Sequence, residues 1–243
     1  MSLVNVSGDA EQKVVQLLGI PSVDHSTMMN ASKLLNICLS RGDIRKLVDL
    51  PTEDGVSAVS ILGALLSKVE DGSGSQLLSQ LADAIGSAGN DASTAAPQVA
   101  LLATLYNMTT APPDKVGLLV RMIQIAAKQD PTLLEEQSSA LGKWMNAPRL
   151  SGMLDEWEIV PAGRRALYRA AAEGASTALA KQQFTLLVVE TYSQADVDAS
   201  GIADAKQAAI GAIQDPVSLF VQQRKLMSLP AIKSLGQNEG MWF

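Results

Sequence analysis

Apolar residues recur every three to four positions along most of the chain, which is the spacing of one face of an α-helix. The stretch from Arg164 to Leu235 follows this pattern most clearly. Within it, Glu173-Gly174-Ala175-Ser176 predicts a break, because glycine can end one helix and serine can cap the next. Asp215-Pro216 predicts another helix start. The apolar positions of the first two runs are Leu167, Ala170 and Ala171, then Leu179, Phe184, Leu187, Val188 and Thr191.

Further helices are expected before this stretch, with turn residues between them. Gly19, Gly42 and Pro51 are expected to end the early helices, and Ser26 and Thr52 are expected to cap the next ones. Residues 86–93 are the most polar and predict a hinge or mobile loop. The expected apolar helix segments are Val14–Leu18, Ser26–Cys38, Ile44–Leu50, Val56–Val69, Gln76–Ile85, Val99–Tyr106, Leu118–Ala126, Leu133–Trp144 and Leu150–Trp157.

No segment alternates apolar and polar residues with the period of two that a half-buried strand requires. Short helices joined by short turns therefore predict an all-α fold, an antiparallel helical-repeat array of the right-handed α-solenoid type. The sequence itself contains no strict repeat, so we expect the repetition to be one of architecture only.

The amino-acid composition favours helices and argues against RNA as a direct partner. The chain has 243 residues, of which 47% are hydrophobic and only 4% aromatic, so it can bury a large core without the aromatic residues that strands favour. The net charge of −6 argues against direct contact with RNA, because binding a phosphate backbone needs clustered lysine and arginine. The only cysteine, Cys38, excludes an intramolecular disulfide and is typical of a reducing compartment.

The N-terminal sequence MSLVNVSGDAEQ has neither the basic region nor the apolar core of a signal peptide. No apolar run approaches the roughly 18 to 20 residues that span a bilayer. Asn5, Asn30 and Asn107 each begin an N-x-S/T pattern, which we interpret as chance matches without a secretory signal. We expect a cytoplasmic protein that does not enter a membrane.

The candidate catalytic and metal-binding residues favour ordinary structural roles. His25, the only histidine, lies in a capping segment between Asp24 and Ser26, and neighbours in sequence do not form a catalytic triad. One cysteine and one histidine cannot supply the usual zinc ligands. Asp196 and Asp198 lack the rest of a calcium-binding loop.

The other polar motifs are equally weak as chemical signals. Gly72-Ser73-Gly74 has no following Gly-Lys-Ser/Thr and is interpreted as a linker, and Cys38 as a buried structural thiol. Adjacent helical residues point about 100° apart, so neither Glu135-Glu136 nor Asp155-Glu156 converges.

Two basic pairs, Arg164-Arg165 and Arg224-Lys225, are expected to be solvated or to meet an acidic neighbour. Most of the nine methionines, with Trp144 and Trp157, are expected in the core; an exposed patch of them would mark a subunit interface. We therefore expect no catalytic, cofactor-binding or metal-binding residues.

Three segments of the second half resemble a known family. They are LLVVETYS at Leu186–Ser193, AKQAAIGAIQDP at Ala205–Pro216 and LMSLPAIKSL at Leu226–Leu235. Their order and spacing are similar to those of the subunit M family of eukaryotic translation initiation factor 3, in which a helix ending in a Thr-Tyr turn precedes a helix ending in Asp-Pro and the entry to a PCI domain. The resemblance covers the last 140 residues or so, and more weakly Trp157-Glu158-Ile159 and Leu101–Ala127.

The resemblance implies a helical-repeat region at residues 1–160 and the helical entry of a PCI domain at residues 161–243. It also implies a non-enzymatic scaffold, without cofactor, that contacts other PCI and MPN subunits and reaches the small ribosomal subunit through the complex during mRNA recruitment and translation initiation. The family's winged helix is expected to be absent, so we expect weak incorporation into the complex. The alternatives are a PCI-type subunit of the proteasome lid or signalosome, a free-standing helical-repeat adaptor, and an all-helical enzyme.

Overall fold

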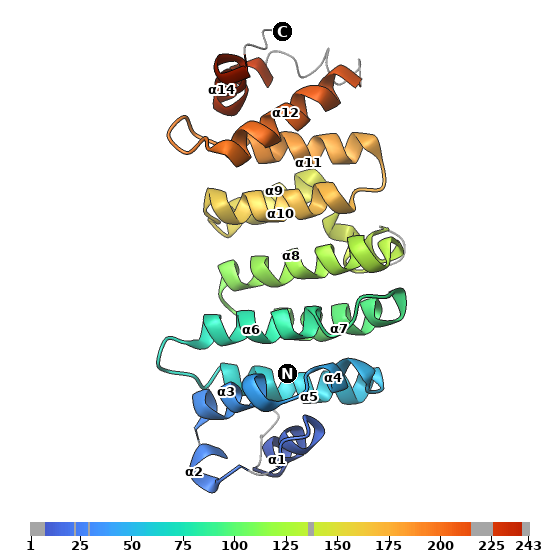
Figure 1. The fold of residues 1–243 in the computed structure, drawn as a ribbon, viewed down its shortest axis with the longest axis vertical. Coiled ribbons are helices and arrows are strands. Elements are labelled where there is room, and N and C mark those ends of the chain that lie inside the picture. The colour runs from blue at the N-terminus through green and yellow to red at the C-terminus, as the bar shows by residue number, and fades with distance from the viewer. Residues whose placement is uncertain (1–7, 22, 29, 136–138, 215–225, 240–243) are drawn as a thin grey trace. The chain divides into compact units, whose positions relative to one another are not determined.

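The computed structural model describes residues 8–21, 23–28, 30–135, 139–214 and 226–239, and all regular structure in these ranges is helical. Within each part of the chain, successive helices pack side by side, and short loops reverse the chain direction between them (Figure 1). The all-α class and the array of neighbouring antiparallel helices are therefore confirmed. The right-handed solenoid type stays a prediction.

The chain divides into two compact units, Met1–Leu133 and Leu134–Phe243. This division lies before the boundary between residues 160 and 161 expected from the family resemblance. The reason is that helix α9 (Ala147–Glu156) packs against α11 (Ala178–Glu190), so it belongs with the helices that follow it. The assignment of residues 161–243 to the entry of a PCI domain stays a prediction.

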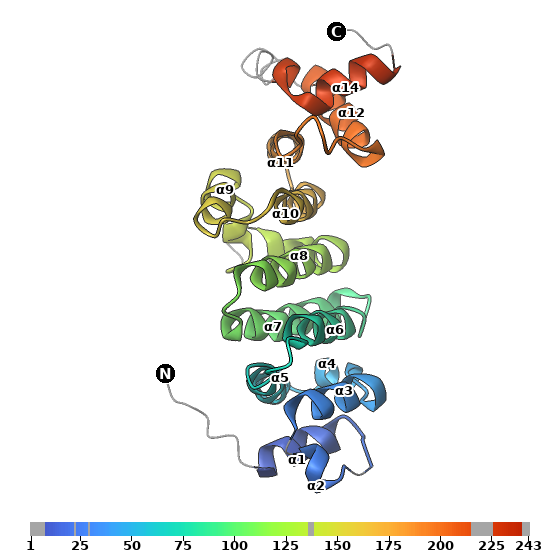
Figure 2. The same ribbon diagram turned by 90° about the vertical axis from the view of Figure 1, so that its left-hand side faces the viewer.

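The first unit is a stack of helices with a continuous apolar core. Helix α7 packs on both α5 and α8, while α6 packs on α8 and α3 packs on α5 and α6 (Figure 2). Its helices are α1 (Gly8–Leu17), α2 (His25–Met28), α3 (Ala31–Arg41), α4 (Arg45–Asp49), α5 (Thr52–Leu66), α6 (Gly74–Gly86), α7 (Ala92–Met108) and α8 (Pro112–Gln129).

Spacing alone explains which residues of these helices are buried. Leu101, Leu102 and Leu105 of α7 recur at helical intervals and are at most 2% exposed, and Leu119 and Ile123 of α8 are completely buried. Burying a leucine or isoleucine side chain stabilises a fold by about 1.5–3 kcal/mol. The apolar stripes predicted from the sequence therefore form the core of this unit.

The first helix ends where its sequence predicts. Gly19 has a φ of +74°, a conformation that glycine adopts without steric cost. Its N–H donates to the carbonyl of Gln16, and the N–H of Ile20 donates to the carbonyl of Val15 at 3.1 Å. These two bonds form a Schellman motif, which satisfies carbonyls that the helix end leaves open.

The single helix expected from Ser26 to Cys38 is instead two helices. The carboxylate of Asp24 accepts a hydrogen bond from the Thr27 N–H and so caps α2. Asn30 then caps α3, because its side chain accepts from the Lys33 N–H at 2.9 Å. The apolar spacing is continuous across this break, so periodicity could not reveal it, whereas the capping preference of asparagine could.

Two other helix starts also differ from the prediction. Helix α7 begins at Ala92 rather than near Val99, because Asp91 forms a capping box with Thr94. Pro97 therefore lies within the helix. Thr52 is the first residue of α5, and the N-cap position belongs to Pro51.

Residues 87–91 connect α6 and α7 and are held by side chains, in contrast to the expected hinge. The buried Gln98 amide donates to the carbonyls of Ile85 at 3.0 Å and of Gly86 and Gly89 at 3.3 Å. Gln129 of α8 also donates to Gly89, at 3.2 Å. These bonds tie the end of α6 and the connection after it to α7 and α8.

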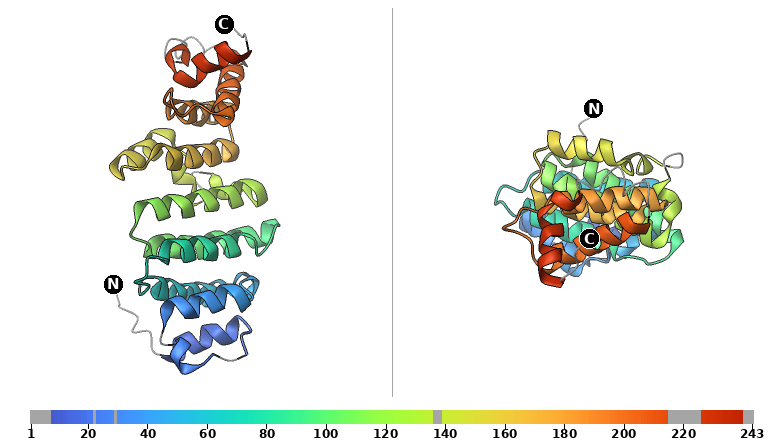
Figure 3. Two further views of the ribbon diagram at one scale, coloured as in Figure 1. Left: turned by 60° about the vertical axis from the view of Figure 1, so that its left-hand side comes forward. Right: turned by 90° about the horizontal axis from the view of Figure 1, so that it is seen from above.

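The second unit is built from consecutive packed helices. Helix α10 (Pro161–Gly174) packs on α11, α11 on α12 (Ala199–Gln214), and α12 on α14 (Pro230–Glu239), as Figure 3 shows from two further directions. Pro161 occupies the first helical turn of α10, as predicted. Phe184, Val188 and Val189 of α11 are at most 2% exposed and form part of the core of this unit.

The helix expected at Leu133–Trp144 does not form as a continuous element. The described residues between Pro131 and Trp144 form two 3₁₀ turns instead, Pro131–Leu134 and Gly142–Trp144. The Ser139 hydroxyl accepts hydrogen bonds from the N–H groups of Leu141 and Gly142, both at 3.1 Å, and such local bonds compete with helix formation.

Helix α11 differs from the prediction at its first turn and on its apolar face. Thr177, and not Ser176, caps α11 by accepting from the Ala180 N–H at 3.1 Å. Leu179, expected on the apolar face, is 53% exposed. The predicted helix start at Asp215-Pro216 lies outside the described residues.

Candidate functional site

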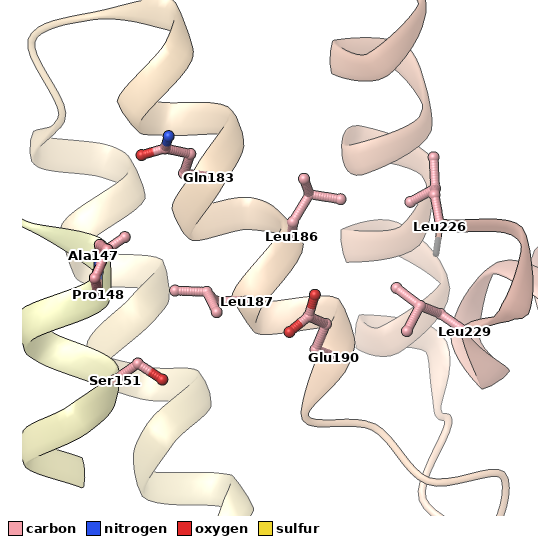
Figure 4. Close-up of a pocket in the computed structure, with 9 residues that line it drawn as sticks. All are labelled: Ala147, Pro148, Ser151, Gln183, Leu186, Leu187, Glu190, Leu226 and Leu229. Carbon is pink, nitrogen blue, oxygen red and sulfur yellow. The ribbon is translucent and has the colours of Figure 1, made fainter. Parts of the chain in front are cut away.

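The second unit has a groove between α9, α11 and residues 226–229. Its volume is about 450 Å³, and Figure 4 shows side chains from these three segments around it. Most of the lining is apolar. The lining residues are Ala147, Pro148, Ser151, Gln183, Leu186, Leu187, Glu190, Leu226 and Leu229.

Helical geometry places these residues on the groove. Asn146 caps α9 by accepting from the Arg149 N–H at 3.1 Å, and Ala147 and Ser151 then lie one turn apart on the same face. On α11, the four lining residues from Gln183 to Glu190 follow the i, i+3, i+4, i+7 pattern, so they form one stripe along the helix.

A small polar cluster lies beside this groove. Tyr168 of α10 is 2% exposed, and its burial raises the pKa of the phenol, a rise that the nearby Glu190 increases and a hydrogen bond with Ser151 decreases. A phenol with a raised pKa stays protonated at neutral pH. Tyr168 is therefore poorly suited to activate the Ser151 hydroxyl as a nucleophile, because that role needs a proton acceptor.

The lining of the groove is suited to contact with apolar groups. Its apolar lining consists of four leucines, Ala147 and Pro148, and its polar residues are a hydroxyl from α9 and an amide and a carboxylate from α11.

The densest polar network of the second unit lies elsewhere, where α10, α11 and α12 meet. The Arg169 guanidinium donates to the Asp204 carboxylate at 2.5 Å, to the Tyr192 hydroxyl at 2.7 Å and to the Ser200 hydroxyl at 2.6 Å. The Tyr192 hydroxyl in turn donates to Asp204 at 2.9 Å. The hydrogen bond to Asp204 is the largest cause of a raised pKa for Arg169, and the charges of Asp204, Tyr192 and Asp198 add to this rise.

Arg165, one helical turn before Arg169, extends the network to the loop after α11. Its guanidinium lies 4.3 Å from the centre of the Tyr192 ring and pairs with Asp196 at 2.9 Å. This pair and the bond from the Ser193 hydroxyl lower the pKa of Asp196. Arg165 is therefore paired within the chain, which differs from the solvated rim expected for the Arg164-Arg165 pair.

Arg164 has a separate structural role at the end of α9. Its guanidinium donates to the carbonyls of Ile159 at 2.7 Å and Leu154 at 3.0 Å and pairs with the Asp155 carboxylate. A cation at the C-terminus of a helix stabilises the open carbonyls there. The other basic pair, Arg224-Lys225, lies outside the described residues.

The remaining candidate residues are dispersed through the fold. His25 begins α2, and Asp196 and Asp198 lie in the loop before α12, where Asp198 accepts from the Gly201 N–H at 2.8 Å. Cys38 is 1% exposed, and burial raises the pKa of its thiol to about 11, in agreement with a buried structural thiol.

The candidate motifs with acidic residues or glycine also lie at surface positions. Gly72 and Ser73 lie between α5 and α6, with Gly72 at a φ of +77°, and Gly74 is the first residue of α6. Glu135 and the pair Asp155-Glu156 are exposed, and Glu136 lies outside the described residues. No group of three or more potential metal ligands occurs within the described ranges.

The tryptophans are less buried than predicted. Trp144 and Trp157 are both half-buried, and the Arg149 guanidinium lies 5.1 Å from the centre of the Trp144 ring. Met122 and Met153 are core residues, whereas Met108 and Met227 are about two-fifths exposed, at 39% and 41%.

Sequence reasoning missed the network around Arg169 and the groove. The spacing of Arg165 and Arg169 by one turn, opposite Asp196, Ser200 and Asp204 at four-residue intervals, was a usable signal. The groove had no such signal, because leucines that line an open surface have the same spacing as leucines in a core.

No helix within the described ranges is both long and apolar enough to cross a lipid bilayer. Comparison with known proteins adds no family to these observations. The chain matches no protein-family model, and no curated protein matches it at the significance required.

Proposed function

We propose that this chain is a non-enzymatic scaffold subunit of eukaryotic translation initiation factor 3, similar to its subunit M. In this role it works in the cytoplasm and holds neighbouring PCI and MPN subunits in place. It supports binding of the small ribosomal subunit, mRNA recruitment and translation initiation through the complex rather than by contacting RNA itself.

The observation that carries the proposal is the set of contacts that Tyr192 makes in the Thr191-Tyr192 turn. This turn is one of the residue pairs on which the family resemblance rests. Tyr192 is 5% exposed, and its ring and hydroxyl contact Arg165 and Arg169 of α10 and Asp204 of α12. A family anchor is expected to hold several helices together, and the contacts of Tyr192 with α10 and α12 support this role.

The packing and charge of the chain also support a scaffold role. Stacked helices present long faces to solvent, and such surfaces suit protein partners. A net charge of −6 fits protein contacts better than a phosphate backbone. The groove beside Ser151 and Tyr168 offers contact area without an activated nucleophile.

Three alternatives share parts of this support. A PCI-type subunit of the proteasome lid or signalosome would have the same helical architecture, and so would a free-standing helical-repeat adaptor. An all-helical enzyme would need convergent polar groups with shifted pKa values. The partners of the chain separate these possibilities.

The test is to express the tagged chain in eukaryotic cells, to cross-link mildly so that weak association is retained, and to identify the co-purifying proteins by mass spectrometry. We expect subunits of initiation factor 3, together with co-sedimentation of the chain with the small ribosomal subunit. Recovery of lid or signalosome subunits would instead support the first alternative.

A matched control separates specific association from capture by an unfolded chain. Leu167 of α10 is completely buried, so Leu167→Asp should unfold the second unit, which contains the resembling segments, and abolish specific association. If the folded chain recovers no initiation-factor subunit, or if the Leu167→Asp variant recovers the same subunits equally well, the proposal is wrong.

A further inference from the structure

We draw no further inference here: the strongest candidate, the leucine-lined groove between α9, α11 and residues 226–229, carries no proposal of its own because nothing in the structure shows what covers it.

Discussion

Glu158 follows the last turn of α9 with a φ of +51°, in the left-handed region that residues with a Cβ rarely adopt. The conformation is held because the Ile159 N–H donates to Leu154 and the Glu158 N–H donates to Asp155, both at 3.1 Å. This is the Schellman arrangement found at Gly19, but with a side chain at the position that favours glycine. A left-handed φ costs conformational free energy for a residue with a Cβ, and the two hydrogen bonds offset this cost at Glu158.

Replacing Glu158 by glycine should therefore stabilise the protein. We expect Glu158→Gly to raise the free energy of unfolding by about 0.5–1 kcal/mol, because glycine adopts this φ without steric cost. Urea denaturation followed by circular dichroism measures the change. Ala166→Gly, at an exposed position within α10, is the matched control and should destabilise by about 1 kcal/mol. Equal destabilisation by both substitutions would contradict the assignment.

The carboxylate of Asp24 shows how hydrogen bonds alone shift a titration. A hydrogen bond from the Ser26 hydroxyl, followed by bonds from Thr27, lowers the pKa of Asp24 from 3.8 to about 2. A carboxyl whose pKa falls on folding stabilises the folded state above its unfolded pKa. This contribution is lost as the pH falls from about 3.8 toward 2.

Carboxyl-detected NMR titration checks this shift directly. Asp24 should titrate near pH 2, and Ser26→Ala should move its pKa back toward 3.8, because it removes the largest cause. Ser40→Ala, which removes a hydroxyl that bonds only to a backbone carbonyl in its own helix, should leave the pKa of Asp24 unchanged. A pKa that does not respond to Ser26→Ala would show that the capping bonds are not the cause.

Individual helices and the loops between them depend on a few polar side chains. Gln98 is completely buried and ties the end of α6 to α7 through three carbonyls, while its own carbonyl oxygen has no partner among the described residues. An exchange of its amide atoms would place oxygen against those carbonyls, so the present orientation is the favourable one. The order of residues 87–91 thus comes from a residue outside the loop.

Removing the Gln98 amide should loosen this connection. We expect Gln98→Ala to destabilise the first unit by about 1–3 kcal/mol, since it removes a buried donor shared by three carbonyls and the side-chain donor of Gly86. Hydrogen exchange of a peptide covering residues 86–93 should become faster. Gln80→Ala, on the exposed side of α6, should change neither quantity. Unchanged exchange in Gln98→Ala would mean that the loop is held by other contacts.

In the second unit, Arg169 links three helices in a comparable way. Arg169→Ala should destabilise the unit by about 2 kcal/mol, because Asp204, with a side chain that is only 17% exposed, would lose its cationic partner. Tyr192→Phe removes one bond to the same carboxylate and should cost about 1 kcal/mol. Thermal denaturation of both variants measures these costs.

Lys181→Ala, at an exposed position of α11, controls for the loss of a positive charge and should change stability by less than about 0.5 kcal/mol. If Arg169→Ala behaved like Lys181→Ala, the network would contribute no net stability. That result would also weaken the argument that Tyr192 is a structural anchor.

For the whole molecule, the presence of two compact units predicts that the first can fold alone. The buried faces of α5, α7 and α8 meet within Met1–Leu133. A fragment of residues 1–133 should therefore be helical by circular dichroism and unfold cooperatively. A fragment of residues 1–108 lacks α8, exposes the face of α7 that α8 covers, and should unfold more easily or aggregate. An unfolded 1–133 fragment would contradict the independence of the unit.

At this scale the sequence predicted the fold class correctly, because apolar spacing determines which faces of helices become buried. It predicted helix ends less well. Asp24, Asn30 and Asp91 act as caps, and they determine the break between α2 and α3 and the early start of α7. Apolar spacing does not reveal such caps. The helix predicted at residues 133–144 was wrong for the opposite reason. Helical spacing of apolar residues was present, but the Ser139 hydroxyl bonds to nearby N–H groups and favours a local turn.

The candidate site was less predictable than the fold. Arg165 and Arg169 could have been paired with the carboxylates of α12 from their spacing, but the groove depends on which leucines stay uncovered after packing. That depends on how three segments approach one another, and a pattern along a single helix does not contain this information. The expected solvation of Arg164 and Arg165 failed because both guanidinium groups are used within the chain.

The burial of Cys38 has a practical consequence for mapping partners. With 1% exposure and a thiol pKa of about 11, the only native sulfhydryl is shielded from maleimides at neutral pH. A cysteine introduced on the surface, for example by Gln207→Cys on α12, would react alone. Photoactivatable probes can therefore be attached one position at a time without first engineering a cysteine-free background.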